Sequence, residues 1–128
     1  TMYNIEFYTN KTGQSELLDF LESLRVKSIN GNKDARIQFD QIVYCVTLLK
    51  QNGPALKTNK KVTKHIQGDL WELRPGRNRV FYFFYDVAGT YVLLHHFLKK
   101  SQRTPSKEIK KAMKEMNDYL ARKGADQS

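Results

Sequence analysis

The sequence has 128 residues, of which 40% are hydrophobic and 27% are charged, which is typical of one globular domain that needs no disulfide or metal to fold. No apolar run approaches the roughly 18 residues that span a bilayer and no signal-peptide pattern opens the chain, so we expect a cytoplasmic protein. The single cysteine excludes an internal disulfide framework, and the net charge of +9 predicts a polyanionic partner.

The first half of the chain predicts one strand followed by two helices. The alternating stretch YNIEFY indicates a strand at residues 3–8. Helically spaced leucines then predict a helix over 14–26, and a second apolar stripe predicts a helix over about 32–51. Because a short Gly-Asn turn joins them, we expect a hairpin of two antiparallel helices. Cys45 lies beside the second stripe, which favours a packed thiol over a nucleophile.

The second half predicts four strands and a final helix. The stretches VTKHI, LWELR, RVFYFFYD and TYVLLHHFL are rich in branched and aromatic residues and are separated by Gly-containing turns. Thr104 suits the N-cap of the last helix and Pro105 its first position. After the last apolar residues of this helix, we expect a disordered tail at residues 124–128.

The order β-α-α-β-β-β-β-α predicts an α+β domain over residues 2–123, with helices on one face of a mainly antiparallel sheet. The strands at 80–85 and 91–98 show little alternation between apolar and polar residues. Such strands are covered on both faces, or on one face and by a binding partner.

Basic residues gather where the predicted strands end. Residues 1–56 carry six Lys/Arg and six Asp/Glu, whereas residues 57–128 carry sixteen Lys/Arg and seven Asp/Glu, so the second half holds the whole excess. A surface kept basic for solubility, or one that docks an acidic protein, remains an alternative to a nucleic-acid site. The candidates lie in three segments at the sheet ends: Lys57, Lys60, Lys61, Lys64 and His65, then Arg74, Arg77 and Arg79, then Lys99, Lys100 and Arg103.

This set of residue types is suited to cleaving RNA without a metal or another cofactor. RNA supplies the 2′-hydroxyl nucleophile, so a protein needs to orient it, accept its proton and stabilise the charge on the phosphate. Proton transfer usually falls to His or a carboxylate. His65 lies either in the site or on the surface, His95 is expected to be structural, and His96 remains a candidate RNA-binding residue. Neither His95 nor His96 has a carboxylate at metal-ligand spacing, so we expect no zinc site.

Two further groups have alternative interpretations. Tyr82 is a candidate for stacking on a base, although its spacing from Arg79 should place it on the opposite face of the sheet, and Trp71 is interpreted as core. The lysines of the last helix form either a solvated face or a contact with ribosomal RNA phosphates. They are Lys107, Lys110, Lys111 and Lys114.

The strings LWELRPGRNRVFYFF and LLHHFLKKSQRTPSKEIKKAMKE resemble the RelE/ParE superfamily of bacterial toxins, and within it the HigB-like, phage-derived branch. The resemblance covers residues 69–123, whereas the front half agrees only in layout. It implies a RelE-like fold and a type II toxin that cleaves mRNA on the ribosome without a metal. A HigA-like helix-turn-helix antitoxin would neutralise it.

The resemblance also implies roles for individual residues. Arg74 would assist at the scissile phosphate, Lys99 and Lys100 would follow as the basic strand end, and Lys61 and Lys64 would form the upstream basic stretch. With the arginine cluster, this gives Arg74, Arg79, Lys99 and Lys100 as catalytic candidates. The RNA-binding candidates are Lys61, Lys64, His65, Arg77, Tyr82, His96 and Arg103.

The sequence departs from the family pattern at two places. RelE has a tyrosine in its last segment that residues 105–109 lack, and His96 stands where the family often has glycine, so the general acid and base stay open. Two alternative functions also stay open: a ParE-like toxin that binds DNA gyrase, and a non-catalytic basic module that binds nucleic acid or protein. The clustered arginines and lysines favour the ribonuclease, because ParE-type members lack most of them.

Overall fold

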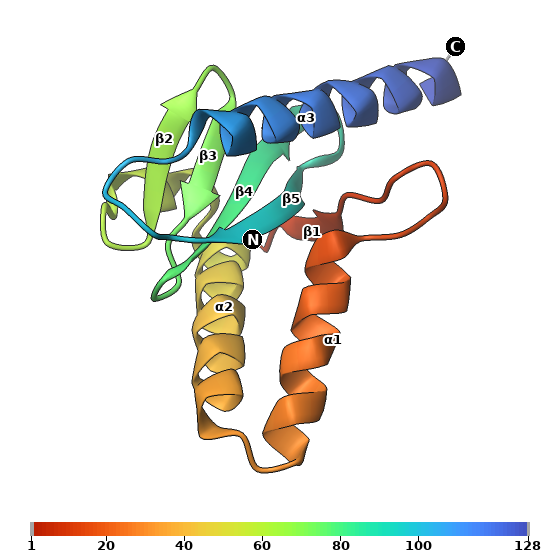
Figure 1. Ribbon diagram of the computed structural model, residues 1–128. Helices are drawn as coiled ribbons and strands as arrows, with labels where there is room; N and C mark the ends of the chain where they lie inside the picture. The colour runs from red at the N-terminus through yellow and green to blue at the C-terminus, as the bar shows by residue number, and fades with distance from the viewer. Residues whose placement is uncertain (1, 128) are drawn as a thin grey trace.

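A five-stranded sheet forms the centre of the computed structural model, which describes residues 2–127 (Figure 1). The predicted order of strands and helices is confirmed. The elements are β1 (Asn4–Phe7), α1 (Glu16–Ile29), α2 (Lys33–Asn52), the 3₁₀ turn η1 (Gly53–Thr58), β2 (Thr63–Gln67), β3 (Leu70–Leu73), β4 (Asn78–Tyr85), the 3₁₀ turn η2 (Asp86–Ala88), β5 (Thr90–Leu98) and α3 (Ser106–Gln127).

The strands lie in the order β1-β5-β4-β3-β2. β1 pairs with β5 in parallel, and the remaining neighbours are antiparallel, as predicted for a mainly antiparallel sheet. The β3–β4 turn and the end of β5 lie at the same end of the sheet, because Asn78 pairs with Leu98. This register brings the arginine-rich turn next to the lysines that follow β5.

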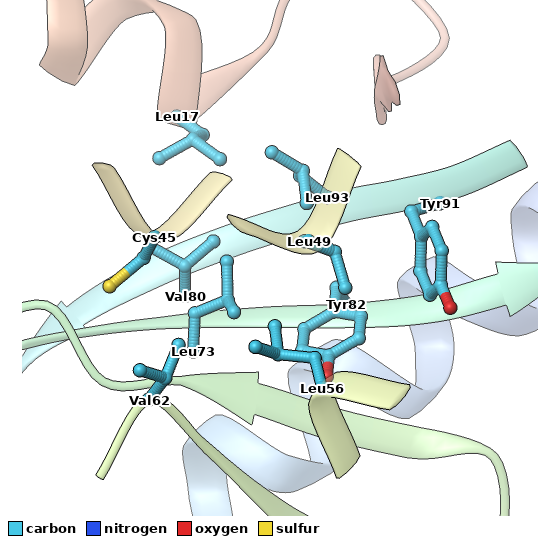
Figure 2. Close-up of a cluster of buried hydrophobic side chains, with 10 residues drawn as sticks. All are labelled: Leu17, Cys45, Leu49, Leu56, Val62, Leu73, Val80, Tyr82, Tyr91 and Leu93. Carbon is cyan, nitrogen blue, oxygen red and sulfur yellow. The ribbon is translucent and has the colours of Figure 1, made fainter. Parts of the chain in front are cut away.

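Helices cover both faces of this sheet, so the prediction of helices on one face was wrong. The face that carries Val80 and Tyr82 packs against Leu17 of α1 and Leu49 of α2 (Figure 2). The opposite face packs against α3 through a second core cluster, whose buried helical members are Ala112, Met116 and Tyr119. Strands that are apolar on both faces lose contact with water only when both faces are covered, which accounts for the weak alternation along β4 and β5.

The helices α1 and α2 form the predicted antiparallel hairpin, which projects from the sheet (Figure 1). The Ser15 side chain caps α1 by accepting from the Leu18 amide at 3.1 Å, and the Asn32 side chain caps α2 by accepting from the Ala35 amide at 2.9 Å. The distal parts of the two helices pack mainly on each other. Cys45 is buried as predicted, and burial raises the pKa of its thiol to about 11.

The start and end of α3 differ from the sequence prediction. The Thr104 hydroxyl donates to Glu72 Oε1 of β3 at 3.0 Å, and the helix begins at Ser106. Thr104 is therefore not the N-cap that the sequence predicted. The helix continues to Gln127, so residues 124–127 are helical where a disordered tail was expected, and residue 128 lies outside the described residues.

Across residues 2–127, no helix has the length and apolar character that crossing a membrane requires.

Candidate functional site

A buried carboxylate, Glu72, lies at the centre of the basic end of the sheet. Alternation along β3 places it on the α3 face, opposite Phe81 of β4, and only 2% of the residue is exposed. Its Oε2 lies 3.8 Å from Nε of Arg79 and 3.9 Å from Nε of Arg74, while its Oε1 accepts from the Thr104 hydroxyl. Our sequence interpretation missed Glu72. The signal was its position two residues before Arg74, which puts both side chains on one face of the strand.

Arg79 is an anchor of this arrangement and is 6% exposed. Its Nη1 donates to the carbonyl oxygens of Gly76 at 2.8 Å and Asn78 at 2.9 Å, which holds the β3–β4 turn. Burial, and next the nearby Arg74, lower the pKa of the Arg79 guanidinium, while Glu72 acts in the opposite direction. The predicted catalytic candidate Arg79 therefore lies beneath the surface, with its hydrogen-bonding capacity directed at the turn and its charge balanced by Glu72.

Of the two arginines near Glu72, Arg74 is the accessible one, with 29% of its side chain exposed. Its backbone amide donates to the Val62 carbonyl at 2.8 Å, and its Nη1 donates to the Lys60 carbonyl at 3.2 Å. These contacts orient the guanidinium between two hollows in the surface. The sheet-end hollow is narrow and is lined by Glu72, Arg74, Arg79, Phe97, Lys99, Ser101, Gln102, Arg103 and Thr104. The β2 hollow encloses about 480 Å³ and is lined by Lys57, Lys60, Thr63, Lys64, His65, Trp71 and Arg74.

The remaining basic candidates divide between these hollows and the surrounding surface. The Lys99 amide donates to the Arg77 carbonyl at 2.8 Å, which ties the end of β5 to the β3–β4 turn and brings the Lys99 side chain into the sheet-end hollow. Arg103 reaches the same hollow on the link into α3. Lys61, Lys100 and Arg77 are exposed and do not line either hollow within the described chain, so the structure does not place them with Arg74.

The three histidines lie in three different environments. His65 lines the β2 hollow, and its Nε2 lies 2.7 Å from the Gly68 carbonyl oxygen. His95 is buried against α3, where Nδ1 contacts Glu115 and Nε2 lies 3.1 Å from Glu108, so the structural role predicted for it is confirmed. No group of three or more His, Cys, Asp and Glu side chains within residues 2–127 is arranged to hold a metal ion.

His96 lies on the face of the sheet that α1 and α2 cover, and among the described residues it belongs to the lining of neither hollow. Its ring stacks on Phe20 of α1 with a centroid separation of 3.7 Å, and its Nδ1 is buried without a hydrogen-bond partner among the described residues. Burial, and next the neighbouring His95, lower the pKa of His96 to about 4. A histidine that stays neutral at pH 7 and packs on a helix supplies no cation to a phosphate, so the structure does not support the predicted RNA-binding role of His96.

The depressed pKa of His96 predicts that the protein loses stability in mild acid. The unfolded chain binds a proton near pH 6.5 and the folded protein only near pH 4, so the stabilisation is complete above pH 6.5 and is lost as the pH falls towards 4. The loss should reach about 3 kcal/mol. Urea unfolding of the protein and of a His96→Phe variant across this range measures it. An equally steep loss in the variant would assign the acid sensitivity to other groups.

Tyr82 also differs from its predicted role. It is 3% exposed, and its hydroxyl shares a hydrogen bond of 2.7 Å with Thr63 Oγ1 inside the core. Burial raises the pKa of Tyr82 to about 12. Its ring is therefore not free to stack on a base. Trp71, which we interpreted as core, is only partly buried and lines the β2 hollow.

Comparisons with known proteins identify a family and several similar solved structures. Residues 32–117 match the family described as "Phage derived protein Gp49-like (DUF891)". The RelE–RelB complex from Pyrococcus horikoshii OT3 aligns at 16% identity and a TM-score of 0.49, covering 78% of this chain and 98% of that chain. The toxin–antitoxin complex RelBE2 from Mycobacterium tuberculosis aligns at 17% identity and a TM-score of 0.42, covering 77% and 100%. The search of curated proteins found no significant match.

Proposed function

The chain belongs to the Gp49-like family of phage-derived proteins, and on this premise we propose that it is the toxin of a type II toxin–antitoxin system, a ribosome-dependent mRNA endoribonuclease of the HigB-like branch. One observation carries the proposal. The accessible guanidinium of Arg74 shares a hollow with Lys99 and Arg103. It lies beside the buried carboxylate of Glu72, which also pairs with Arg79. Guanidinium and ammonium groups held in this way match the charge of a phosphate in its transition state.

The proposed reaction is an internal transfer at one phosphate of the message. The 2′-oxygen forms a bond to phosphorus while the bond from phosphorus to the 5′-oxygen breaks, which leaves a 2′,3′-cyclic phosphate and a 5′-hydroxyl. Arg74, with Lys99 and Arg103, would stabilise the negative charge that builds on the non-bridging oxygens. This role needs fixed positive groups close to phosphorus, and guanidinium and ammonium groups supply them.

His65 is our candidate for the group that accepts the 2′-hydroxyl proton. Of the three histidines, it alone lines a hollow to which Arg74 also belongs. When its Nε2 donates to the Gly68 carbonyl, Nδ1 carries the lone pair that a general base needs. The leaving 5′-oxygen also needs a proton, and the same imidazole can return it once protonated.

The partners that we propose are an antitoxin and the ribosome, which places the protein in the cytoplasm. A HigA-like helix-turn-helix antitoxin would find apolar surface on the projecting hairpin, where Ile29, Ile37 and Tyr44 are more than half exposed. The ribosome would contact α3, whose exposed lysines border a hollow with an apolar floor formed by Ile109 and Met113.

A double substitution in α3 tests the ribosome contact. Lys110 and Lys114 both line that hollow, whereas Lys111 forms an ion pair of 2.6 Å with Glu16 and is less available. The variant Lys110→Gln/Lys114→Gln should bind ribosomes more weakly and should lower the slope of log affinity against log salt by about 2, because two phosphate contacts are lost. Co-sedimentation at several salt concentrations measures both. An unchanged slope would mean that this face is only solvated.

Mapping of mRNA ends tests the whole proposal. Primer extension on a defined message, with and without purified ribosomes, should reveal discrete cuts that need ribosomes and disappear in the Arg74→Ala variant. Growth arrest without cuts would instead favour the gyrase-binding alternative, which a supercoiling assay would then reveal. A protein that neither cuts nor arrests growth would be a binding module.

A further inference from the structure

The β2 hollow combines a tryptophan face with an unbalanced positive charge. Four of its seven lining residues, Lys57, Lys60, Lys64 and Arg74, carry a permanent positive charge. No carboxylate belongs to this lining within the described chain. A hollow of about 480 Å³ with this composition suits an anion that also has an apolar, flat part.

Trp71 is held at this place by the pairing of β2 and β3. The register sets it opposite His65, with the two ring centroids 5.0 Å apart. The ammonium group of Lys57, on an exposed and flexible side chain from η1, lies 5.5 Å from the centre of the indole. A mobile cation therefore approaches one face of the indole, and a flat ligand can replace it there.

A second hollow adjoins the indole on the side of the β2–β3 turn. It encloses about 420 Å³, and Lys57 and Trp71 belong to its lining as well. Trp71 thus contributes to two surface depressions, which explains why it is only partly buried although its neighbours Glu72 and Leu70 are fully covered. Packing alone does not require this large residue at a position that reaches the surface.

We propose that the β2 hollow is a nucleotide subsite, in which a base stacks on Trp71 and the adjoining phosphates bind Lys60, Lys64 and Arg74. The proposal rests on the ribonuclease function proposed above and adds a place for the substrate. Because Arg74 lines both hollows, a phosphate bound to it is next to the stacked base. Stacking on Trp71 would then set the position of the scissile phosphate relative to Lys99 and Arg103. Every base has an aromatic face, so we expect the subsite to accept any of the bases.

The indole itself provides the assay, because Trp71 is the only tryptophan of the chain. The intact protein is titrated with a short single-stranded DNA, which lacks the 2′-hydroxyl and cannot be cut by the proposed reaction. We expect saturable quenching of tryptophan fluorescence that weakens as salt rises. A matched oligonucleotide with abasic sites keeps the phosphates and should quench far less. Binding that leaves the fluorescence unchanged, or equal quenching by both ligands, would overturn the proposal.

Two substitutions separate stacking from packing. Trp71→Phe keeps an aromatic face, whereas Trp71→Leu keeps a smaller apolar side chain without one. By the anisotropy of a labelled oligonucleotide, the Phe variant should bind nearly as well as the original protein and the Leu variant roughly tenfold more weakly. Thermal unfolding of both variants identifies any loss of fold. Equal affinities for two folded variants would show that Trp71 only packs.

The lysines of the hollow have a matched control elsewhere on the surface. Lys60→Gln should reduce the salt slope of oligonucleotide binding by about 1, because one phosphate contact is lost. Lys27→Gln removes the same charge from the exposed far end of α1 and should leave the slope unchanged. Equal slopes in the two variants would mean that general charge and not the hollow attracts the oligonucleotide.

The failures of the two proposals are distinguishable. Ribosome-dependent cuts that need Arg74, together with an unresponsive indole, would keep the ribonuclease and remove the subsite. Base-dependent quenching without any cleavage would keep the subsite as a nucleotide site and remove the ribonuclease.

Discussion

Replacing Arg74 by alanine should abolish both mRNA cleavage and growth arrest while the protein stays folded. Loss of one preorganised group that stabilises transition-state charge costs on the order of 3 kcal/mol in the barrier, which is a rate reduction of about a hundredfold or more. The fold should tolerate the change, because Arg74 is partly exposed and its Nε lies 3.9 Å from Glu72, beyond hydrogen-bonding distance. Primer extension on ribosomes and growth after induction measure the two effects.

An arginine of the same chain serves as the matched control. Arg25 lies on α1 and forms an exposed ion pair with Glu22, away from both hollows. Arg25→Ala should keep full cleavage and toxicity. If a folded Arg74→Ala protein were as toxic as the original, Arg74 would have no part in the mechanism, and equal losses in both variants would indicate a general effect of charge.

Replacing Glu72 by glutamine should produce the largest loss of stability. The change keeps the shape of the side chain and an oxygen for the Thr104 hydroxyl, but it leaves Arg79 buried without a compensating charge. Removing one partner of a buried pair typically costs about 3–5 kcal/mol. We expect the low end, about 3 kcal/mol, because the charged atoms are 3.8 Å apart and Arg79 keeps its hydrogen bonds to the turn. Urea unfolding gives this free energy.

Two controls identify the cause of that loss. Glu22→Gln removes a carboxylate from an exposed ion pair and should not change the free energy of unfolding measurably. The double variant Glu72→Gln/Arg79→Gln removes both buried charges and should be less destabilised than the sum of the two single variants. Strictly additive losses would show that the two side chains do not compensate each other.

Glu72 also links the stability of the fold to the position of the candidate site residues. Arg74 takes its position from a strand end and from contacts to Glu72 and the Lys60 carbonyl. The Thr104 hydroxyl meets the same carboxylate, so the link that carries Lys99 and Arg103 is attached to it as well. A change at Glu72 should therefore reduce cleavage along with stability, whereas changes at Arg103 should affect cleavage alone.

Much of the fold could be predicted from local patterns. Alternation in YNIEFY, helical spacing of apolar residues and glycine-containing turns predicted every β-strand and α-helix in order. These signals are local because a strand or helix exposes its period within a few residues. The predicted number of helix-covered faces was wrong, because the apolar pattern of β4 fits either a helix or a binding partner on the second face of the sheet. The position of α3 settles this question.

The candidate site was predicted only in part. The turn position of Arg74 and the strand end at Lys99 predicted that the two would meet, and they line one hollow. The depth of Arg79, the role of Glu72 and the packing of His96 against Phe20 were not predicted. Whether a charged residue is desolvated depends on which distant segments pack over it. The residues next to it in the sequence do not indicate which segments those are.

By itself, the sequence determined the order of elements, the basic character of one sheet end and the presence of Arg74 there, because periodicity, turn residues and charge are properties of short segments. Only the tertiary structure decided which arginine is accessible, which is buried against a carboxylate, and which aromatic ring reaches the surface. The contact of Thr104 with Glu72 joins residues 32 positions apart. Solvent exposure and ion pairing are set by such distant contacts, since the local dielectric and the partners of a charge come from whichever segments pack around it.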